Sequence, residues 1–447
     1  MDAIVNCGEE LFATFENKRG TIGVVGLGYV GLPLARAIME AGFKVIGVDV
    51  DREKIRMLRA GQDYIRHIDG RYFVKKIRSK SFFCTVNFAA LSHAHAIVIC
   101  VPTPLTKYRE PDLSYVAKTA ASIVPYMRRG QLIILESTTY PGTTAEMLVP
   151  ALEKSGLKCG SDFFVAFSPE REDPGNPEFD TYSIPKVVGG MDDMARELAV
   201  AFYGSVVSEV VSVSSAATAE AVKITENIFR SVNIALVNEL KLIFGAMGID
   251  IWEVVEAAKT KPFGYMPFYP GPGLGGHCIP IDPFYLSWKA REYDMPTRFI
   301  ELAGQINTSM PQHVVAVCAD TLNMRFSKGL NGARVLLVGL AYKKNVDDMR
   351  ESPGLKLIEL LERYGATVDY FDPYIPSIPV TREHPEFTGR QSQAGGAACF
   401  ANYDLALIAT DHDNVGYREI VENSKIVIDT RNACERHGVW GDNIVKA

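Results

Sequence analysis

Apolar runs of strand length alternate with amphipathic stretches of helical length in the first half of the chain. The predicted strands cover residues 22–26, 44–49, 96–101, 131–135, 163–167 and 186–189, and a helix is expected over 32–41. Strands that alternate with helices are typical of a parallel, doubly wound sheet. The pattern therefore predicts an α/β domain over residues 21–213, preceded by a polar lead-in helix within residues 1–20.

A different pattern begins at residue 214. Two serines suited to helix capping, Ser214 and Ser215, precede about 30 residues without glycine or proline, enough for a helix of roughly 45–50 Å. Its apolar side chains go nearly all round, which indicates a helix buried on most sides. We expect it to be the spine of a helical middle domain over 214–325 and to form a subunit contact in a homodimer or higher homo-oligomer.

The alternation of strands and helices restarts near residue 326. Strands are predicted over 334–339, 367–371, 405–409 and 425–429, and a helix over 354–364. The expected fold class is thus α/β, with two Rossmann-like doubly wound parallel-sheet domains joined by a long central helix and a helical middle domain. The second, over 326–447, has no Gly-x-Gly-x-x-Gly after its first strand, so we expect it to hold the nucleotide portion of a substrate rather than a second dinucleotide.

Composition narrows the class of protein. Apolar residues make up 47% of the chain, charged residues 22%, and the net charge is -6, which disfavours a general nucleic-acid surface. No apolar run approaches the roughly 18 residues that span a bilayer, and the N-terminal residues lack a signal-peptide core. The eight cysteines form no Cys-x-x-Cys pair, so we expect no metal site, no disulfide framework and a reducing, cytoplasmic location.

A glycine turn follows the first predicted strand and opens the next helix. It reads Gly26-Leu27-Gly28-Tyr29-Val30-Gly31, and Asp49 ends the second strand. In a dinucleotide fingerprint the first glycine permits the turn, the second lets the backbone approach pyrophosphate, and the third lets helix and strand pack closely. An acid at Asp49 would bind the ribose hydroxyls and repel a 2′-phosphate, which favours NAD over NADP. The alternative is a plain packing turn.

Polar residues follow two further strands. Thr103 comes after the strand at 96–101, and Glu136, Ser137 and Thr138 come after the strand at 131–135. Because ligands bind beyond the carboxyl ends of parallel strands, these four are candidates for the cofactor edge. Equally, they could be helix caps and turn formers.

Two groups of polar residues are candidates for acid–base and oxyanion chemistry. Glu170 lies in a charged loop after a strand and could act as a general acid or base, although a solvated loop is the alternative. Lys223 and Asn227 are four apart on the long helix and so share one face. They could stabilise an oxyanion, or equally form a structural hydrogen bond.

Cys278 lies in a glycine- and proline-rich loop over residues 270–283, with Asp282 four residues later. Such a loop has a fixed course and admits a ligand close to the backbone. A thiol there becomes a strong nucleophile if a cation such as Lys223 lowers its pKa, whereas many free cysteines are inert and buried. His277 is adjacent in sequence, but adjacent side chains in an extended chain point apart, which disfavours a Cys–His dyad.

A charged segment follows the first strand of the second α/β domain. Lys343 and Arg350 within it suit anionic phosphates, and Arg431 follows a later strand of the same domain. A solvated charged loop is the alternative.

Taken in order, these motifs resemble the UDP-glucose/GDP-mannose dehydrogenase family, the UDP-sugar 6-dehydrogenases. The motifs, from about Thr21 to Arg431, are GLGYVGLP, VPTP, ESTTYPGTT, SPE, KxxxN, GPGLGGHCIPIDP, AYKKNVDDMRES and DTRN. The segments SPEREDPGNP and KPFGYMPFYPGPGLGGHC look most like members that act on UDP-N-acetylglucosamine in bacterial surface-polysaccharide (O-antigen or capsule) pathways.

The resemblance implies two successive NAD-dependent oxidations of a sugar's primary alcohol to a carboxylate, with two NAD⁺ reduced per sugar. It makes Cys278 the nucleophile, through a thiohemiacetal and then a thioester. It gives oxyanion stabilisation to Lys223 and Asn227, and acid–base roles to Glu170 and Asp282, with Thr138 helping to hold the water. The implied cofactor contacts are Gly26, Leu27, Gly28, Tyr29, Val30, Gly31, Asp49, Thr103, Thr138 and Arg350. The implied substrate contacts are Glu170, Lys223, Asn227, Tyr269, Gly271, Gly273, Gly275, Tyr342, Lys343 and Arg431.

One departure from the family pattern bears on the substrate. The UDP-glucose enzymes have a second glutamate four residues after the SPE or NPE glutamate, and here that position is Pro174, with Glu172 and Asp173 nearby. We therefore expect a larger 2-acetamido sugar, with UDP-N-acetylglucosamine as the leading hypothesis. The alternatives are UDP-glucose, UDP-N-acetylmannosamine or UDP-N-acetylgalactosamine, a simple two-electron hydroxyacid dehydrogenase, and a non-catalytic NAD-binding sensor.

Overall fold

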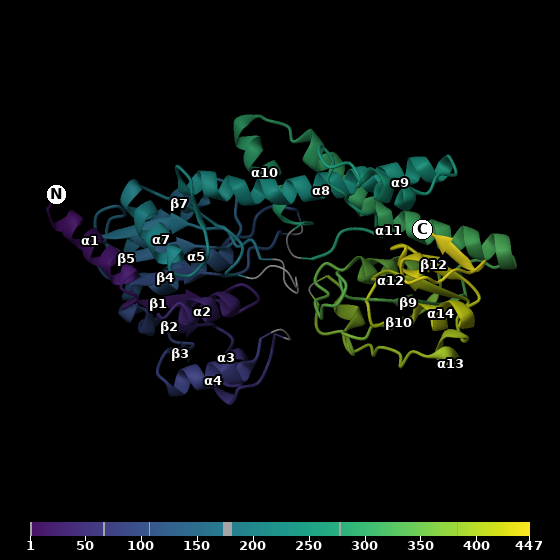
Figure 1. Ribbon diagram of the computed structural model, residues 1–447, viewed down its shortest axis with the longest axis horizontal. Coiled ribbons are helices and arrows are strands. Elements are labelled where there is room, and N and C mark those ends of the chain that lie inside the picture. Colours follow the sequence, from purple (N-terminus) through teal and green to yellow (C-terminus); the bar gives the residue numbers. More distant parts are fainter. Residues whose placement is uncertain (1, 66–67, 107, 173–180, 277–278, 382) are drawn as a thin grey trace. The chain divides into compact units, whose positions relative to one another are not determined.

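The computed structural model describes residues 2–65, 68–106, 108–172, 181–276, 279–381 and 383–447 (Figure 1). The chain divides into two compact units. The first comprises Met1–Glu226 and Phe284–Met295, and the second comprises Asn227–Pro283 and Pro296–Ala447. Each unit contains one sheet covered by helices.

The sheet of the first unit has the strand order β3-β2-β1-β4-β5-β6-β7-β8 among the described residues. The strands are β1 Thr21–Val25, β2 Lys44–Val48, β3 Phe82–Thr85, β4 Ala96–Ile99, β5 Gln131–Leu135, β6 Phe163–Phe167, β7 Lys186–Gly190 and β8 Val210–Ser212. Adjacent strands are parallel except β6 and β7, so the predicted parallel, doubly wound sheet is confirmed with one antiparallel pair. The central strands are buried on both faces, which explains their continuous apolar runs.

Helices cover both faces of this sheet, as its doubly wound pattern predicts. They are α1 Asp2–Glu16, α2 Gly31–Glu40, α3 Arg52–Ala60, α4 Gly70–Arg78, α5 Ser114–Ile123, α6 Val149–Leu152 and α7 Asp193–Gly204. Aspartates cap three of them, because the side chains of Asp51, Asp69 and Asp192 accept backbone N–H groups of the first turns of α3, α4 and α7.

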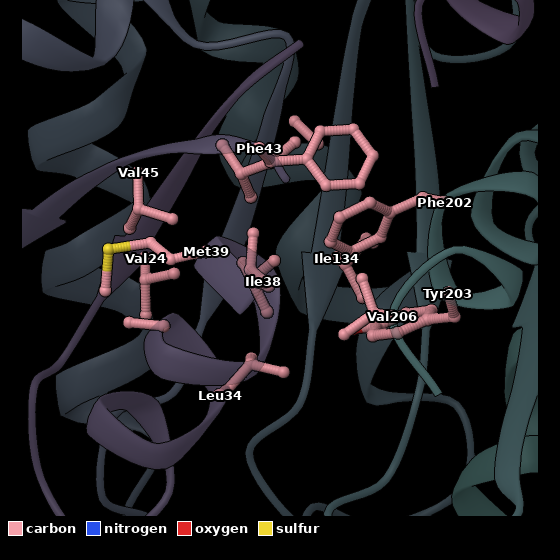
Figure 2. Close-up of a cluster of buried hydrophobic side chains, with 14 of the residues drawn as sticks. Val24, Leu34, Ile38, Met39, Phe43, Val45, Ile134, Phe202, Tyr203 and Val206 are labelled. Atoms are coloured by element: carbon pink, nitrogen blue, oxygen red, sulfur yellow. The ribbon is translucent and has the colours of Figure 1, made fainter. Parts of the chain in front are cut away.

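Aromatic contacts join the lead-in helix to the core. The ring of Phe202 on α7 lies 5.6 Å from that of Phe15 on α1 and 5.8 Å from that of Phe43, measured between centroids. Figure 2 shows Phe43 and Phe202 side by side above Ile38 and Val206. The N-terminal helix is therefore a packed part of the first unit, which extends the sequence prediction of a lead-in helix.

The long helix α8 spans Ala216–Ala246 and confirms the helix predicted in this region. Ser215 caps it by accepting the N–H of Thr218 on Oγ at 3.1 Å. The expectation that it is buried on most sides was wrong for the single chain, because Phe229, Leu236 and Ile243 are about half exposed. These three residues are spaced seven apart, which is about two helical turns, so they lie on one side of the helix as an apolar stripe.

The second unit contains a parallel sheet of order β10-β9-β11-β12-β13 among the described residues. Its strands are β9 Arg334–Val338, β10 Thr367–Phe371, β11 Leu405–Ile408, β12 Val427–Asp429 and β13 Ile444–Lys446. The remaining α-helices of the described residues are α9 Ile251–Ala258, α10 Asp282–Ala290, α11 Arg298–Phe326, α12 Pro353–Arg363, α13 Ala397–Phe400, α14 Tyr417–Asn423 and α15 Ala433–Arg436. Together the two sheets and the long helices give the α/β fold class that the sequence predicts.

Candidate active site

The glycine turn between β1 and α2 requires two of its glycines for internal packing. Gly26 has a φ of +93°, and a Cβ there would lie 2.5 Å from the carbonyl oxygen of Cys100. A Cβ on Gly31 would overlap the carbonyl oxygen of Gly26. At Gly28, in contrast, a Cβ would meet nothing within 4 Å. The chain's own packing therefore explains Gly26 and Gly31, while Gly28 leaves its backbone open, as the approach of a pyrophosphate requires.

Asp49, just after β2, ties the glycine turn to the neighbouring strand. Its Oδ2 accepts the N–H of Leu27 at 2.8 Å and lies 3.3 Å from Lys54 Nζ, and its Oδ1 accepts the N–H of Asp51 at 2.9 Å. Each carboxylate oxygen can accept two hydrogen bonds, so Oδ1 keeps capacity for a ribose hydroxyl. The turn, the start of α2 and Asp49 together fit a dinucleotide such as NAD.

The polar residues after β4 and β5 have internal partners. The hydroxyl of Tyr285 donates to the carbonyl of Thr103 at 2.6 Å, and Ser137 Oγ donates to the carbonyl of Val101 at 2.7 Å. Ser137 thus has the structural role that the sequence left open. Thr138 is half-buried, and the neighbouring Thr139, which sequence reasoning missed, has a buried hydroxyl without a hydrogen-bond partner among the described residues.

A buried lysine links Glu170 to the residues after β5. Lys186 Nζ lies 3.2 Å from Glu170 Oε2 and 3.1 Å from Glu136 Oε1. Tyr203 also donates to Glu136, and the N–H groups of Arg171 and Glu172 donate to Glu170 Oε1 at 2.8 and 2.6 Å. Sequence reasoning did not find Lys186, because a lysine that begins a strand has no local signal of burial.

The two glutamates of this network differ in protonation. Burial raises the pKa of Glu136 to about 7, despite the positive charge of Lys186. Burial alone would also raise the pKa of Glu170, but the charge of Lys186, the amide of Glu172 and the charge of Lys223 together lower it below its ordinary value. Glu170 is therefore held as a carboxylate at neutral pH, the state that a general base needs. The effect of the Lys223 charge on Glu170 also shows that these two predicted site residues lie near one another in the first unit.

Asn227 and Asp282, two other predicted site residues, meet in the second unit. Asn227 Nδ2 donates to Asp282 Oδ2 at 2.6 Å, and both side chains are buried. Asp282 is the first residue of α10, and Asn227 lies one turn after Lys223 on α8. Cys278 and His277 lie outside the described residues, so the role of Cys278 remains a prediction.

The loop before residue 276 contacts the second sheet domain through its glycines. Asn238 Oδ1 accepts the N–H of Gly271 at 3.0 Å, and a Cβ on Gly271 would overlap the guanidinium of Arg431. A Cβ on Gly275 would lie 2.8 Å from Cβ of Tyr342. The structure thus places two pairs of predicted substrate contacts side by side, Gly271 with Arg431 and Gly275 with Tyr342, although the members of each pair are far apart in sequence.

The other predicted contacts have neighbours of their own. Gly273 has a φ of +138° and packs against Pro311 and Pro353. The hydroxyl of Tyr269 donates to Glu256 Oε1 at 2.6 Å. Arg350 belongs to the second unit and pairs with Asp348 at 2.6 Å. Its assignment to the cofactor, and that of Lys343 to the substrate, remain predictions.

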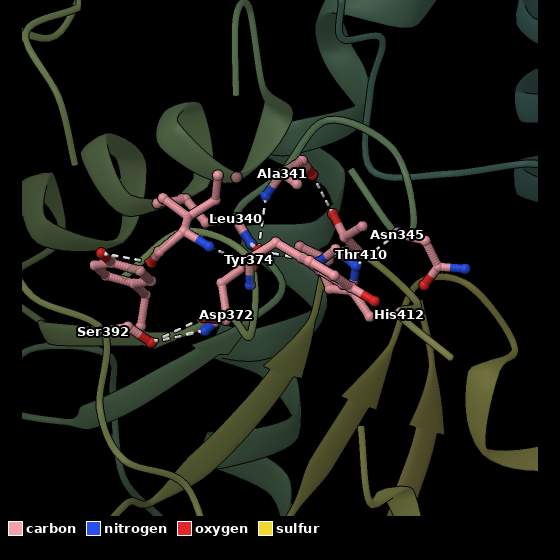
Figure 3. A network of polar contacts seen from close by, with 12 residues as sticks. Leu340, Ala341, Asn345, Asp372, Tyr374, Ser392, Thr410 and His412 are labelled. Carbon is pink, nitrogen blue, oxygen red and sulfur yellow. Dashed lines mark hydrogen bonds and ion pairs between the residues drawn. The ribbon is translucent and has the colours of Figure 1, made fainter. Parts of the chain in front are cut away.

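The loop after β9 repeats the architecture of the glycine turn but is filled by the chain itself (Figure 3). Gly339 has a φ of +84°, and Asp372, after β10, accepts the N–H groups of Leu340 and Ala341 at 2.6 and 2.9 Å. His412 accepts the N–H of Asn345 on Nδ1 at 2.9 Å, so its Nε2 carries the proton and donates to Asp372 at 3.0 Å. Asp372 has no free acceptor for a ribose, unlike Asp49.

Two general features accompany these sites. Across the part of the chain that the structure describes, no helix is long and apolar enough to cross a membrane. Within the same residues, His, Cys, Asp and Glu side chains form no group of three or more that could hold a metal ion.

The first unit has a glycine turn that fits a dinucleotide, with acidic and cationic side chains beyond the strand ends, and the second unit has a nucleotide-type domain. Together these features define a dinucleotide-dependent oxidoreductase. The chain belongs to the UDP-glucose/GDP-mannose dehydrogenase family. It matches the family's NAD binding domain over residues 20–207, the central domain over 217–309 and the UDP binding domain over 336–436. It is therefore an NAD-dependent UDP-sugar dehydrogenase.

Relatives that are named for different UDP-sugar substrates resemble the chain over most of its length. It is 40% identical to a UDP-N-acetyl-D-glucosamine 6-dehydrogenase from Pseudomonas aeruginosa, over 89% of this chain and 93% of that protein. It is 34% identical to a UDP-N-acetyl-D-mannosamine dehydrogenase from Methanococcus maripaludis, over 94% of each. The structure of a UDP-D-ManNAc dehydrogenase from Pyrococcus horikoshii aligns with a TM-score of 0.85 at 33% identity, over 95% of this chain and 98% of that one.

Proposed function

We propose that this enzyme oxidises the primary alcohol at carbon 6 of UDP-N-acetylglucosamine to the carboxylate, with two NAD⁺ reduced per sugar. The observation that carries the proposal is the 40% identity, over 89% of the chain, to a dehydrogenase of that substrate. The replacement of the UDP-glucose enzymes' second glutamate by Pro174 also supports a 2-acetamido sugar.

The residues of the glycine turn would hold the cofactor. Gly28 offers an open backbone, the first turn of α2 offers its N–H groups to the pyrophosphate, and Asp49 offers one acceptor to a ribose hydroxyl. NAD supplies the hydride acceptor for both oxidations. Thr103, Thr138 and Arg350 complete the proposed cofactor contacts.

The sugar's reacting carbon would be held by Cys278. Its thiolate adds to the aldehyde, the resulting thiohemiacetal is oxidised to a thioester, and water releases the carboxylate and restores the thiol. Lys223 and Asn227 would stabilise the oxyanion, a contact worth about 2.7–4 kcal/mol in other enzymes. Asn227 also orients Asp282 through their 2.6 Å hydrogen bond.

Glu170 is the proposed general base. The ion pair with Lys186 and two backbone N–H donors hold its side chain as a carboxylate, ready to take a proton from the sugar hydroxyl or from the hydrolytic water. Thr138 would help to hold that water. The UDP moiety would contact Tyr269, Gly271, Gly273, Gly275, Tyr342, Lys343 and Arg431.

UDP-N-acetylmannosamine is the second candidate substrate. Relatives that carry that substrate in their names are 34 and 36% identical to this chain over 94 and 92% of its length. The two sugars differ in the configuration at carbon 2, the carbon that bears the acetamido group.

A substrate panel tests the proposal. Purified full-length protein is mixed with NAD⁺ and separately with UDP-N-acetylglucosamine, UDP-N-acetylmannosamine, UDP-N-acetylgalactosamine and UDP-glucose, and NADH absorbance is followed. We expect the highest kcat/KM with UDP-N-acetylglucosamine. No NADH from that sugar, with rapid turnover of UDP-glucose, would overturn the choice. No turnover of any nucleotide sugar would instead support an NAD-binding sensor.

A further inference from the structure

Lys241 is a buried cation that has no part in the proposed catalysis, cofactor binding or substrate binding. It lies on α8 and is 9% exposed, and its Nζ has no hydrogen-bond partner among the described residues. Burying an ammonium group without a partner is unfavourable, and a leucine or methionine would fill the same space without this penalty. A lysine retained at such a position therefore calls for an explanation beyond packing.

The carboxylate whose negative charge acts on Lys241 is that of Asp429, and it already accepts hydrogen bonds from other groups. Asp429 Oδ1 accepts the N–H groups of Arg431 and Ala433 at 2.9 and 3.1 Å, and Oδ2 accepts that of Cys434 at 2.9 Å. Burial, followed by the positive charge of Arg431, lowers the pKa of Lys241 to about 8, and Asp429 offsets this only in part. Burial and the positive charge of Lys241 also lower the pKa of His313.

Arg431 is a second cation with donors to spare beside the same loop. Its Nε donates to the carbonyl of Ala409 at 3.0 Å, whereas its Nη1 and Nη2 have no acceptor in the part of the chain that is described. The guanidinium lies directly against Gly271, where a Cβ would overlap it. Asn238, which accepts the N–H of that glycine, lies three residues before Lys241 on α8 and hence on the same face.

We infer that Lys241 and Arg431 together bind the nucleoside diphosphate part of the substrate, with Lys241 as a ligand-binding residue in addition to those named above. This inference rests on the proposed function, and it supplies the acceptor atoms that both side chains lack. A nucleoside diphosphate is anionic and rich in acceptors, and Arg431 lies within the stretch that matches the family's UDP binding domain. Gly271 has no side chain, so the loop backbone lies directly against the Arg431 guanidinium.

The inference is tested with UDP itself, by isothermal titration calorimetry on the full-length enzyme. Lys241→Met removes the charge at similar length, Lys241→Arg keeps it, and Lys425→Met is a control at an exposed ion pair with Asp404. We expect Lys241→Met to weaken UDP binding at least about 10-fold while NAD binding stays unchanged. Lys241→Arg retains most of the affinity, and the control retains all of it.

Two further readouts separate ligand binding from a structural role. In the ligand-free enzyme Lys241→Met should raise the melting temperature, because it replaces an unpaired buried charge. If Lys241 had a structural role, the same substitution would lower the melting temperature. At pH 8 the parent enzyme should take up as much as about half a proton when it binds UDP, and Lys241→Met should take up less. The proton uptake is measured as the difference in binding heat between buffers that have different ionisation enthalpies. UDP affinity of Lys241→Met equal to that of the parent would overturn the inference.

Failure of this inference can be told from failure of the proposed function. UDP is common to all candidate substrates, so its affinity does not depend on which sugar is oxidised. If the parent enzyme binds UDP through Lys241 but oxidises no UDP-N-acetylhexosamine, only the proposed substrate is refuted.

Discussion

His412 Nε2 donates to Asp372 at 3.0 Å, and Asp372 occupies in the second sheet domain the position that Asp49 occupies in the first. Both aspartates follow the second strand of their sheet's β-α-β unit and accept N–H groups from a turn that begins at a left-handed glycine, Gly26 or Gly339. In the first domain the turn stays open at Gly28. In the second, His412 and four backbone N–H donors saturate the Asp372 carboxylate, so this domain keeps the architecture without the ribose site.

The Asp372–His412 pair is expected to stabilise the second unit. His412→Leu removes one of the five donors to the buried carboxylate and should lower the free energy of unfolding by about 1–3 kcal/mol. Burial alone would raise the pKa of Asp372, but His412 and backbone amides lower it. Its contribution to stability is therefore present above the ordinary aspartate pKa and is lost as the pH falls through the depressed value. Urea unfolding at several pH values measures both effects; equal stability of parent and variant at pH 7 would refute the account.

Two glycines of the turn, Gly28 and Gly31, should respond differently to alanine. Gly28→Ala meets no atom of the chain within 4 Å, so its melting temperature should stay near that of the parent while NAD affinity falls by about 10-fold or more, because the Cβ intrudes on the pyrophosphate. Gly31→Ala overlaps a carbonyl of the turn and should lower stability as well. Calorimetric NAD binding and thermal unfolding distinguish the two. Unchanged NAD affinity in Gly28→Ala would count against the cofactor assignment.

Lys186 is predicted to control both stability and the pH dependence of catalysis. Lys186→Met leaves Glu136 and Glu170 buried without their shared cation, which should cost about 3–5 kcal/mol of stability. Because Lys186 lowers the pKa of Glu170, its removal raises that pKa and moves the acid limb of the kcat/KM profile to higher pH. Lys186→Arg should restore much of the stability, and the exposed Lys158→Met should change neither property. An acid limb that does not move would exclude Glu170 as the base.

The apolar stripe of α8 is the predicted subunit contact. Leu236 and Ile243 are about half exposed in the single chain, and an exposed apolar patch of this kind is typical of an interface. The double substitution Leu236→Glu with Ile243→Glu should convert a homo-oligomer to monomers in sedimentation velocity, while the exposed Glu239→Gln should leave it assembled. A parent that sediments as a monomer would contradict the prediction.

Much of the fold follows from local patterns. The predicted strand at 131–135 matches β5, and that at 163–167 matches β6, because buried parallel strands have unbroken apolar runs bounded by polar turns. The short edge strands β3, β8 and β13 were missed, since three or four residues carry too little periodicity. Pro311 lies inside the 29-residue helix α11 and breaks the pattern by which such a helix is found.

The candidate site could be predicted only in part, for a physical reason. Glycines, a loop cysteine and an aspartate at a strand end show in the sequence, because backbone geometry restricts those positions. Partners such as Lys186 for Glu170, or Arg431 for Gly271, come from distant segments, and no local pattern specifies them. The burial of Lys241 is likewise a property of the fold, since its sequence neighbours resemble those of any amphipathic helix.

Product stoichiometry tests the central claim most directly. The enzyme is given a limiting amount of UDP-N-acetylglucosamine with excess NAD⁺, and NADH and the product's mass are measured for the parent and for Cys278→Ser. The account predicts two NADH per sugar and a UDP-uronic acid from the parent, and loss of the second oxidation in the variant. One NADH per sugar with an aldehyde or ketone product from the parent, or full four-electron oxidation by Cys278→Ser, would contradict it.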